Sequence, residues 1–429
     1  MTSRLLIVGG LAVFDRLRKP KTRPGPADPA SCPAVAVLIP AFNEERVIVN
    51  TVRSVLASEY PRGKLRVIII DDGSTDATVP ITKQTFAREI AAGDVVVLTK
   101  PNAGKAEALN FGLAQLCDDE QIFIGIDADT VIAPKAVARL VPHFDDLRVA
   151  AVAGNTKVGN RVNLWTRWQA LEYITSQNFE RRALDALGAV SVVPGAIGAW
   201  RTSAVRAVGG YQLGTVAEDA DLTMSLLEAG MRVQYEDRSL AFTEAPISSN
   251  GLMRQRFRWS FGILQSLWKH RGAFRRKGAL GWFALPNIAI FQILLPVVSP
   301  LIDLMFVFGA LSYFIDRYFH PYTANPASFE KLVLFFVIFL VTDFIASLIA
   351  FSLERHEPGA GEDVWLLSQV WLQRFAYRQL FSLVLFKTLR RAIDGRPFSW
   401  DKLERTAPLA AAKPDLTSRD AGQSHMVVK

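Results

Sequence analysis

The chain has 429 residues, of which 50% are hydrophobic and 21% are charged, and its formal net charge is +8. This balance is too apolar for an ordinary soluble enzyme and too charged for a protein lying wholly in a membrane, so it favours a soluble domain joined to a membrane domain. The two cysteines, Cys32 and Cys117, stand in unrelated contexts and suggest neither a disulfide framework nor a Cys/His metal site.

The basic residues are gathered in three places along the chain. They cluster at 16–23, 269–277 and 387–396, and each cluster borders an apolar stretch. Lysine and arginine beside apolar segments are typical of the cytoplasmic flanks of membrane proteins. We therefore expect membrane lipid as a partner and no nucleic acid.

The N-terminal segment, residues 1–33, combines a short apolar run with a linker. Residues 5–14 are apolar, and Arg16 and Arg18 follow them. The run is too short to cross a bilayer core and lacks an evident signal-peptide cleavage site, which favours a truncated or partial membrane anchor. Residues 20–33 are rich in proline, which is typical of a linker.

Residues 34–278 have the pattern of an α/β domain. Strand-like and helical patterns alternate there, with strands at 35–39, 65–70, 95–98 and 122–126 and helices at 44–58, 76–91 and 105–116. This alternation predicts a doubly wound, mostly parallel sheet. Such sheets bind ligands at the carboxyl ends of their strands, and polar motifs follow Ile39, Ile70 and Ile126 at these ends.

Beyond this domain, residues 279–406 predict an α-helical membrane domain of interfacial or transmembrane helices, and residues 407–429 predict a disordered tail. Three apolar segments lie in the helical part, at 279–315, 332–353 and 364–386. Prolines and Asp303 interrupt the first of them, while the second has about the length of one membrane crossing.

The charge pattern also predicts a topology. Residues 387–405 are strongly basic, so the positive-inside rule puts them in the cytoplasm with the α/β domain and requires an even number of crossings. We expect 332–353 and 364–386 to cross, with 354–363 outside. Residues 279–315 are then interfacial or re-entrant, while a hairpin or a single tilted crossing there is the alternative.

Two acidic motifs follow strand-like runs. Asp127 and Asp129 stand one residue apart, and such a pair suits Mg²⁺ or Mn²⁺ held between the protein and a diphosphate, although alone it is more often a solvated turn. Asp71 and Asp72 fit two roles equally well. They can form a tight turn with a helix cap, or they can accept hydrogen bonds from the base or ribose of a nucleotide.

Two further motifs lie closer to the membrane segments. Glu218 and Asp219 precede an apolar helical stretch, where acidic residues either cap the helix or supply a general base for an acceptor hydroxyl. Gln255, Arg258 and Trp259 precede the first apolar segment. They form either part of a basic amphipathic helix at a bilayer surface or a site where Arg258 contacts a diphosphate and Trp259 stacks on a sugar.

Together, in this order, the motifs resemble those of the processive family-2 glycosyltransferases of the GT-A fold, which include cellulose, chitin and hyaluronan synthases. The resemblance covers at least residues 35–268 and implies that Asp127 and Asp129 bind the metal and that Asp219 is the catalytic base. Ala217 stands where the family usually has threonine. Further substrate- and nucleotide-binding residues implied by the resemblance are Phe42, Glu44, Asp71, Asp72, Lys105, Glu218, Gln255, Arg258 and Trp259.

Within that group, residues 193–201 and 374–405 look most like poly-β-1,6-N-acetylglucosamine synthases and transferases fused behind a polysaccharide deacetylase. The resemblance implies an inverting enzyme that polymerises a β-linked polysaccharide from a UDP-sugar, with UDP-N-acetylglucosamine favoured and Mg²⁺ or Mn²⁺ as cofactor. It implies the growing polysaccharide and a deacetylase or export protein as partners. It also implies a multi-pass protein of the cell membrane whose catalytic domain faces the cytoplasm.

Two other functions fit parts of the sequence. A non-processive transferase acting on a lipid or a single acceptor would share the acidic motifs, but the Gln255–Trp259 motif argues against it. A membrane channel or transporter with a nucleotide-sensing domain would explain the polar residues Gln369, Arg374 and Arg378 in an apolar segment. A conduit, however, needs neither a metal pair nor a base.

Overall fold

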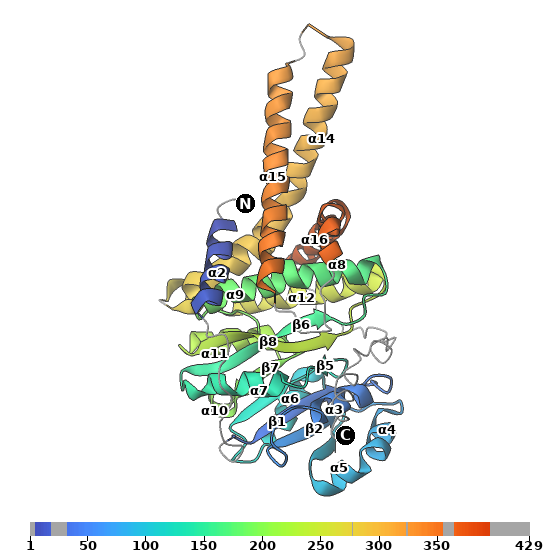
Figure 1. The fold of residues 1–429 in the computed structure, drawn as a ribbon, viewed down its shortest axis with the longest axis vertical. Helices are drawn as coiled ribbons and strands as arrows, with labels where there is room; N and C mark the ends of the chain where they lie inside the picture. The colour runs from blue at the N-terminus through green and yellow to red at the C-terminus, as the bar shows by residue number, and fades with distance from the viewer. Residues whose placement is uncertain (1–4, 19–31, 277, 323–324, 355–363, 395–429) are drawn as a thin grey trace, which may run out of the picture.

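The computed structural model describes residues 5–18, 32–276, 278–322, 325–354 and 364–394. Figure 1 shows an α/β domain from which a long helical hairpin extends, with a layer of helices between the two. Most of the linker predicted at 20–33 and the whole tail predicted at 407–429 lie outside the described residues.

The described strands form one mixed sheet in the order β3-β2-β1-β4-β7-β6-β8-β5. Their bounds are β1 (Val35–Ala41), β2 (Leu65–Asp71), β3 (Val95–Thr99), β4 (Ile122–Gly125), β5 (Val131–Ile132), β6 (Val149–Val158), β7 (Gly198–Arg201) and β8 (Arg232–Thr243). The pairs among β3, β2, β1 and β4 are parallel, as is the pair of β6 and β8. Strand β7 runs antiparallel to both its neighbours, and β5 runs antiparallel to β8.

The predicted strands at 35–39, 65–70, 95–98 and 122–126 are therefore confirmed, whereas the prediction of a mostly parallel sheet holds for only part of it. The sheet is mixed because β7 reverses direction between β4 and β6. This strand has four residues, Gly-Ala-Trp-Arg, too few to show a strand pattern in the sequence.

Apolar residues from both faces of the sheet form the core of the domain. Leu38, Ile39, Ile68, Ile70 and Ile124 are fully buried, as expected for parallel strands covered by helices on both sides. Burying each such side chain contributes about 1.5–3 kcal/mol, so this core holds the strand ends in fixed relation to one another.

The helices that cover the sheet largely follow the predicted ones. Their bounds are α3 (Ile48–Leu56), α4 (Thr78–Thr85), α5 (Ala87–Ala92), α6 (Lys105–Ala114), α7 (Ala136–Leu140), η3 (Val141–Asp145), α10 (Thr202–Ala207) and α11 (Glu218–Glu228). The helix predicted at 76–91 is divided at Phe86, and the one predicted at 44–58 begins later, at Ile48.

A layer of helices separates the sheet from the hairpin (Figure 1). It contains α8 (Leu164–Glu172), η4 (Tyr173–Asn178), α9 (Phe179–Asp185), α12 (Ser249–Lys269), η5 (Arg271–Arg275), η8 (Val364–Gln369) and α16 (Val370–Ile393). The N-terminal helices η1 (Leu5–Gly9) and α2 (Gly10–Arg18) pack against α9, where Ala12 is fully buried. The N-terminal apolar segment thus contributes to this layer.

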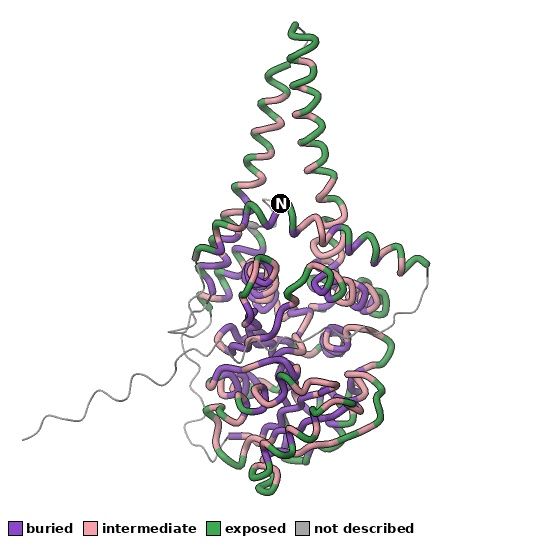
Figure 2. The backbone as a smooth tube through the Cα atoms, turned by 90° about the vertical axis from the view of Figure 1, so that its right-hand side faces the viewer, coloured by how far each residue is buried: buried purple, intermediate pink, exposed green. Residues whose placement is uncertain are grey.

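The hairpin consists of two long apolar arms. The outgoing arm, Leu280–Phe319, is one 40-residue helical run made of η6 (Leu280–Ala284), α13 (Leu285–Asn287), η7 (Ile288–Leu294) and α14 (Leu295–Phe319). The returning arm is α15 (Pro326–Leu353). Both arms are long and apolar enough to cross a membrane, and Figure 2 shows that their outer halves are mostly exposed.

The returning arm ends against the α/β domain, which corrects the topology expected from the sequence. Glu354 is buried, accepts hydrogen bonds from Asn155 and Lys157, and pairs with Arg182 at 3.1 Å. Glu354 therefore lies beside the α/β domain, which contradicts the expectation that residue 354 lies on the far side of a crossing by 332–353. Residues 355–363 lie outside the described part of the chain, and a crossing by 364–386 stays a prediction.

Helix α15 pairs with the outgoing arm, and α16 packs along α12 in the layer below. Ion pairs compensate one acidic charge in each arm of the hairpin, including Asp303, which made a crossing at 279–315 look costly. Asp303 pairs with Arg374 at 2.9 Å, and Asp343 pairs with Arg378 at 2.8 Å. These partners lie far apart in the sequence, so the sequence showed the charges without showing how they are paired.

Candidate active site

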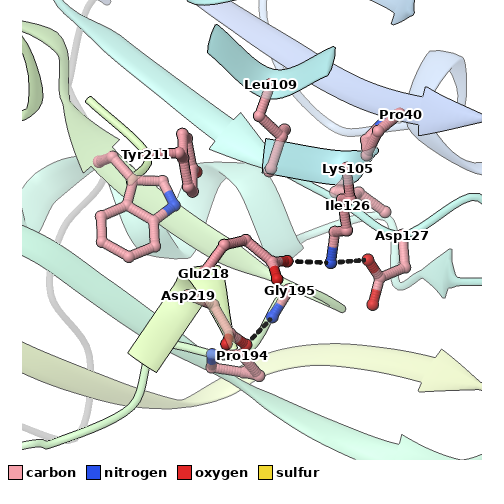
Figure 3. Close-up of a pocket in the computed structure, with 12 residues that line it drawn as sticks. Pro40, Lys105, Leu109, Ile126, Asp127, Pro194, Gly195, Tyr211, Glu218 and Asp219 are labelled. Atoms are coloured by element: carbon pink, nitrogen blue, oxygen red, sulfur yellow. Dashed lines mark hydrogen bonds and ion pairs between the residues drawn. The ribbon is translucent and has the colours of Figure 1, made fainter. Parts of the chain in front are cut away.

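A pocket opens where the carboxyl ends of β1 and β4 meet the first turns of α6 and α11 (Figure 3). It is lined by Pro40, Lys105, Leu109, Gly125, Ile126, Asp127, Pro194, Gly195, Trp200, Tyr211, Glu218 and Asp219. Of the predicted site residues, the fold thus brings Lys105, Asp127, Glu218 and Asp219 together in one pocket. These residues come from segments far apart in the sequence, and the order of the strands in the sheet brings them together.

Lys105 links the two acidic motifs of the pocket. Its Nζ atom lies 2.7 Å from Asp127 Oδ1 and 2.8 Å from Glu218 Oε1. Burial alone would lower the pKa of the Lys105 ammonium, but the carboxylates of Asp127, Glu218 and Asp219 raise that pKa well above its ordinary value. The ammonium of Lys105 therefore lies between Asp127 and Glu218, the residue before Asp219.

Asp219 lies in the first turn of α11 and is held by backbone amides. Gly195 N donates to Asp219 Oδ2 at 3.2 Å, and Ala220 N donates to Asp219 Oδ1 at 2.8 Å. Burial, and after it the neighbouring Glu218 carboxylate, raise the pKa of Asp219 to about 6. A carboxylate with a pKa near neutral is suited to general-base catalysis.

Asp127 and Asp129 follow β4 and differ in exposure. The Asp127 side chain is one-third exposed, whereas Asp129 is buried and its Oδ1 accepts from Thr130 and Thr243 at 3.3 and 3.4 Å. Over the ranges described, no group of three His, Cys, Asp or Glu residues could hold a metal ion. The two carboxylates offer hard oxygen ligands at a strand end, so they fit a cation that takes its remaining ligands from a bound diphosphate and water.

Asp71 and Asp72 lie beside the pocket and organise its loops. Asp72 accepts hydrogen bonds from Ala103 N at 3.0 Å and Gly104 N at 2.7 Å, and it pairs with Lys100 at 2.7 Å. Asp71 Oδ1 accepts from the Ser74 amide at 3.1 Å. Asp72 therefore fixes the loop that leads into Lys105, a role that its sequence motif did not reveal.

Phe42 and Glu44 belong to the loop after β1, which is tied to the loop after β2. The link is Asn43, whose φ is +55°, a conformation that asparagine tolerates better than most residues. Its Oδ1 accepts from the Thr75 amide at 2.7 Å, and the Glu44 amide donates to Thr78 Oγ1 at 2.8 Å. Phe42 and Glu44 thus lie on a loop that these hydrogen bonds hold against the loop after β2.

The residues Gln255, Arg258 and Trp259 lie on α12, which touches the segment before Glu218 and Asp219. A Cβ added at Gly262 would lie 2.5 Å from Ala217 Cβ, so only glycine permits this approach. Gln265 Oε1 accepts from the Val216 amide at 3.0 Å. Gly262, which contacts Ala217, lies within one helical turn of Trp259. This contact brings the motif of Gln255, Arg258 and Trp259 near Glu218 and Asp219.

The residues of α12 differ in their surroundings. Gln255 is buried, and within the described chain its Oε1 atom has no hydrogen-bond partner. Trp259 is half-buried, and the Arg256 guanidinium lies 4.3 Å from the centre of its ring. Neither Gly262 nor Arg256 was assigned a role from sequence, because each depends on contacts between distant segments.

This combination of a mixed sheet, acidic residues at the strand ends and a carboxylate at the start of α11 defines a glycosyltransferase of the GT-A-like fold. The family described as "Glycosyltransferase like family 2" matches residues 33–262, which is more than half of the chain. The protein belongs to this family of enzymes.

Several curated relatives are similar in sequence. An N-acetylglucosaminyltransferase of Neorhizobium galegae is 33% identical over 242 residues, which cover 54% of this chain and 55% of the relative. One of Mesorhizobium japonicum is 31% identical over 324 residues, covering 71% and 72%. A poly-beta-1,6-N-acetyl-D-glucosamine synthase of Staphylococcus aureus is 30% identical over 229 residues, covering 53% and 54%. The similarity therefore spans about half the length of most of these relatives.

A solved structure has the same fold along most of the chain. It is the mannosyltransferase PcManGT of Pyrobaculum calidifontis in complex with GDP-Man and Mn²⁺, with a TM-score of 0.55 at 18% identity. The similarity covers 92% of this chain and 98% of the other. At this level of identity it supports the GT-A-like fold and says nothing about the sugar used.

Proposed function

We propose that the protein is a membrane-bound, inverting glycosyltransferase that polymerises a β-linked polysaccharide from a UDP-sugar. UDP-N-acetylglucosamine is the favoured donor, and a poly-N-acetylglucosamine-like polymer is the product. The observation that supports this most is that Asp219, with its raised pKa, lines the same pocket as the ion pair of Lys105 and Asp127. Relatives named as N-acetylglucosaminyltransferases and as a poly-N-acetylglucosamine synthase support the choice of sugar.

In the proposed reaction Asp219 removes the proton of the acceptor hydroxyl as that oxygen attacks the anomeric carbon of the donor. The new carbon–oxygen bond forms opposite the bond to the diphosphate, which breaks, so the configuration inverts and UDP leaves. Lys105 and Arg258 stabilise negative charge near the leaving group. Asp127 and Asp129 would hold Mg²⁺ or Mn²⁺, which supplies Lewis-acid neutralisation of the diphosphate when bound.

The nucleotide end of the donor is assigned to the loops that carry Phe42, Glu44 and Asp71/Asp72. Gln255 and Trp259 are assigned to the acceptor sugar, since a half-buried indole offers a stacking face and the buried carbonyl oxygen of Gln255 has no partner among the described residues. The growing polysaccharide is the acceptor, and a deacetylase or an export protein is a proposed partner.

The proposed location is the cell membrane, with the hairpin as the membrane-crossing element and the catalytic domain in the cytoplasm. The two apolar arms support insertion, because exposing them to water would leave two long apolar helices uncovered. Sugar nucleotides are made in the cytoplasm, which requires the pocket to face that side.

A panel of UDP-sugars offered to purified membranes tests the proposal. We expect release of UDP from UDP-N-acetylglucosamine and a product of many linked sugars, both absent with the Asp219→Asn variant. Addition of one sugar only, or transfer to a lipid, would contradict polymerisation. Failure to release UDP from every donor would contradict the proposed reaction.

A further inference from the structure

Arg256 is a buried cation inside the α12 motif to which no function has been assigned above. Only 3% of its surface is exposed, and its Nη2 atom lies 2.6 Å from Glu172 Oε2. A buried arginine costs free energy unless its partner is held in good geometry. Here the hydroxyl of Tyr377 donates to the same Glu172 oxygen at 2.7 Å, which fixes the carboxylate from a third helix.

The flat guanidinium of Arg256 is surrounded by aromatic rings. Its central carbon lies 4.3 Å from the ring centre of Trp259, 5.1 Å from that of Phe381 and 6.0 Å from that of Tyr173. Arginine stacks on indole better than lysine does, because its charge is spread over a plane. Because its distance to Trp259 is short, the guanidinium packs against one face of that indole ring.

The partner of Arg256 comes from an unusual place in the fold. Glu172 is the last residue of α8, directly before the π-helical segment η4. Such segments are rare and are found often at functional sites. Glu172, Arg256 and Tyr377 thus join α8, α12 and α16 directly behind the half-buried Trp259.

We propose that Arg256, held by Glu172, is a positioning residue that fixes the orientation in which Trp259 meets the acceptor sugar. This inference rests on the proposed function, in which Trp259 stacks on that sugar. Arg256 itself touches neither donor nor acceptor and acts through the indole. Its loss therefore weakens acceptor binding and leaves binding of the UDP-sugar unchanged.

A double-mutant cycle between Arg256 and Trp259 tests the proposal. UDP release from UDP-N-acetylglucosamine is measured with the full chain in lipid nanodiscs, at increasing concentrations of a short β-linked N-acetylglucosamine oligosaccharide. We expect Arg256→Met to raise the KM for this acceptor about three- to tenfold, as the loss of one partly desolvated cation–π contact predicts, without changing the KM for the donor. In the Trp259→Ala background the same substitution should have no further effect.

Two variants separate positioning from folding. Arg256→Lys keeps the ion pair but removes the planar stacking surface, so it should raise the KM for the acceptor while its unfolding temperature falls by a few degrees at most, as the loss of one cation–π contact predicts. If Arg256→Met does not fold, the cycle is completed with Arg256→Lys. Arg254→Met, at an exposed arginine of the same helix, is the matched control and should change nothing.

The outcomes distinguish this inference from the proposed function. The positioning role would be overturned if the fold-changes in the KM for the acceptor caused by the Arg256 and Trp259 substitutions multiplied in the double mutant. It would also be overturned if the KM for the donor rose together with the KM for the acceptor. Neither result would contradict the proposed reaction. A wild-type protein that releases no UDP from any sugar nucleotide would instead contradict the proposed function.

Discussion

At the scale of single residues, the reactivity of Asp219 is set by opposing influences. Burial and the Glu218 carboxylate raise its pKa, while the Lys105 ammonium and the amide of Ala220 lower it, and the result is a pKa of about 6. A solvated aspartate would be ionised but weakly basic. The pocket thus gives this carboxylate greater basicity while leaving it ionised at neutral pH.

Replacing this carboxylate by its amide tests its role as the base. Asp219→Asn keeps the shape and one acceptor oxygen but cannot take up a proton, so transfer should fall by about 10²–10⁴-fold. Binding of UDP, measured by calorimetry, should change little, because no nucleotide contact is assigned to Asp219. A parallel loss of UDP affinity and transfer would make Asp219 a binding residue.

The pH dependence provides a second test at this scale. The proposed base must be deprotonated to act, so kcat/KM for the donor should rise as the pH increases through about 6 and then level off. Glu218→Gln removes the neighbouring negative charge and should move this rise to lower pH. Glu89→Gln, at a half-buried glutamate of α5 that does not line the pocket, serves as the control and should leave the profile where it is.

The metal pair gives the third prediction. Because Asp127 and Asp129 are expected to bind the cation jointly, EDTA should abolish UDP release and Mg²⁺ or Mn²⁺ should restore it. Asp129→Asn should lose turnover while the protein still enters membranes. Full activity in EDTA would refute the assignment.

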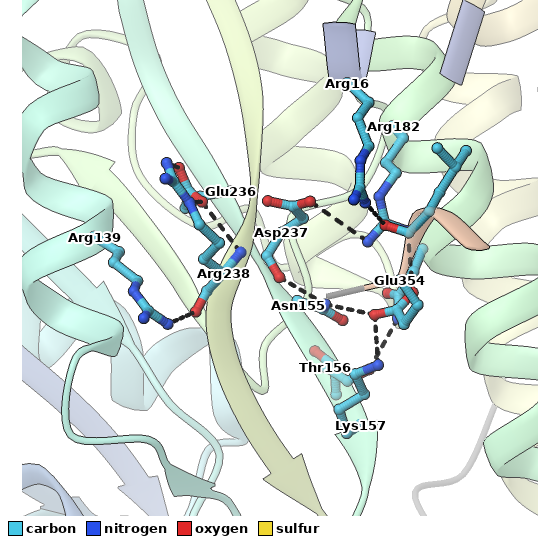
Figure 4. A network of polar contacts seen from close by, with 12 residues as sticks. Arg16, Arg139, Asn155, Thr156, Lys157, Arg182, Glu236, Asp237, Arg238 and Glu354 are labelled. Carbon is cyan, nitrogen blue, oxygen red and sulfur yellow. Dashed lines mark hydrogen bonds and ion pairs between the residues drawn. The ribbon is translucent and has the colours of Figure 1, made fainter. Parts of the chain in front are cut away.

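At the scale of elements, the hairpin is fastened to the α/β domain at both ends by carboxylates. At the outgoing end, Glu180 of α9 accepts hydrogen bonds from Asn287 and Gln292. At the returning end, Glu354 forms a cluster with Asn155, Lys157, Arg182 and Asp237 (Figure 4). The hairpin is therefore joined to the sheet by buried polar contacts as well as by apolar packing.

The returning end yields a prediction about stability. Burial alone would raise the pKa of Glu354, but Arg182 and Lys157 lower it to about 2. Glu354→Gln removes the carboxylate that pairs with the buried Lys157 and Arg182, although Asp237 remains 3.7 Å from Arg182, and it should destabilise the protein by about 3–5 kcal/mol at neutral pH. The loss should appear as a lower unfolding midpoint in detergent, whereas Glu330→Gln, exposed on the same helix, should have no effect.

The sign of the pH dependence follows from the lowered pKa. The contribution of Glu354 is complete above the ordinary glutamate pKa of 4.5 and is lost as the pH falls toward 2. The difference between the midpoints of the wild-type and Glu354→Gln proteins should therefore narrow below pH 4.5. A constant difference would show that the ionised carboxylate is not what stabilises this contact.

The sequence predicted those elements whose residues show a local pattern. Strands β1 to β4 and the apolar helices were visible because each has its own hydrophobic period or run. The reversal at β7 and the pairing of Asp303 and Asp343 with arginines of α16 were not, because they depend on contacts across many residues. The structural role of Asp72 was not visible either, because Asp72 accepts its hydrogen bond from the loop before Lys105.

At the scale of the whole molecule, residues typical of a membrane interface lie where the helix layer meets the hairpin. Trp268 is exposed at the end of α12 and Trp282 at the start of the outgoing arm, and Arg271 stacks on Trp268 with its central carbon 4.3 Å from the ring centre. Tryptophan and arginine at this level are typical of the boundary between lipid and water. An inserted hairpin would thus set this layer at the membrane surface and leave the pocket below it in water.

This arrangement predicts which parts of the chain can be reached from outside a cell. The turn of the hairpin should emerge on the outer side, and Tyr322, fully exposed at that turn, is a suitable place for a cysteine. The native Cys117 is exposed on the α/β domain and reports on the opposite side, while Cys32 is buried. A membrane-impermeant maleimide added to intact cells should therefore label Tyr322→Cys in a Cys117→Ser background. The protein with only its native cysteines should be labelled after permeabilisation alone. Labelling of Cys117 in intact cells, with none at position 322, would put the catalytic domain outside and refute the topology.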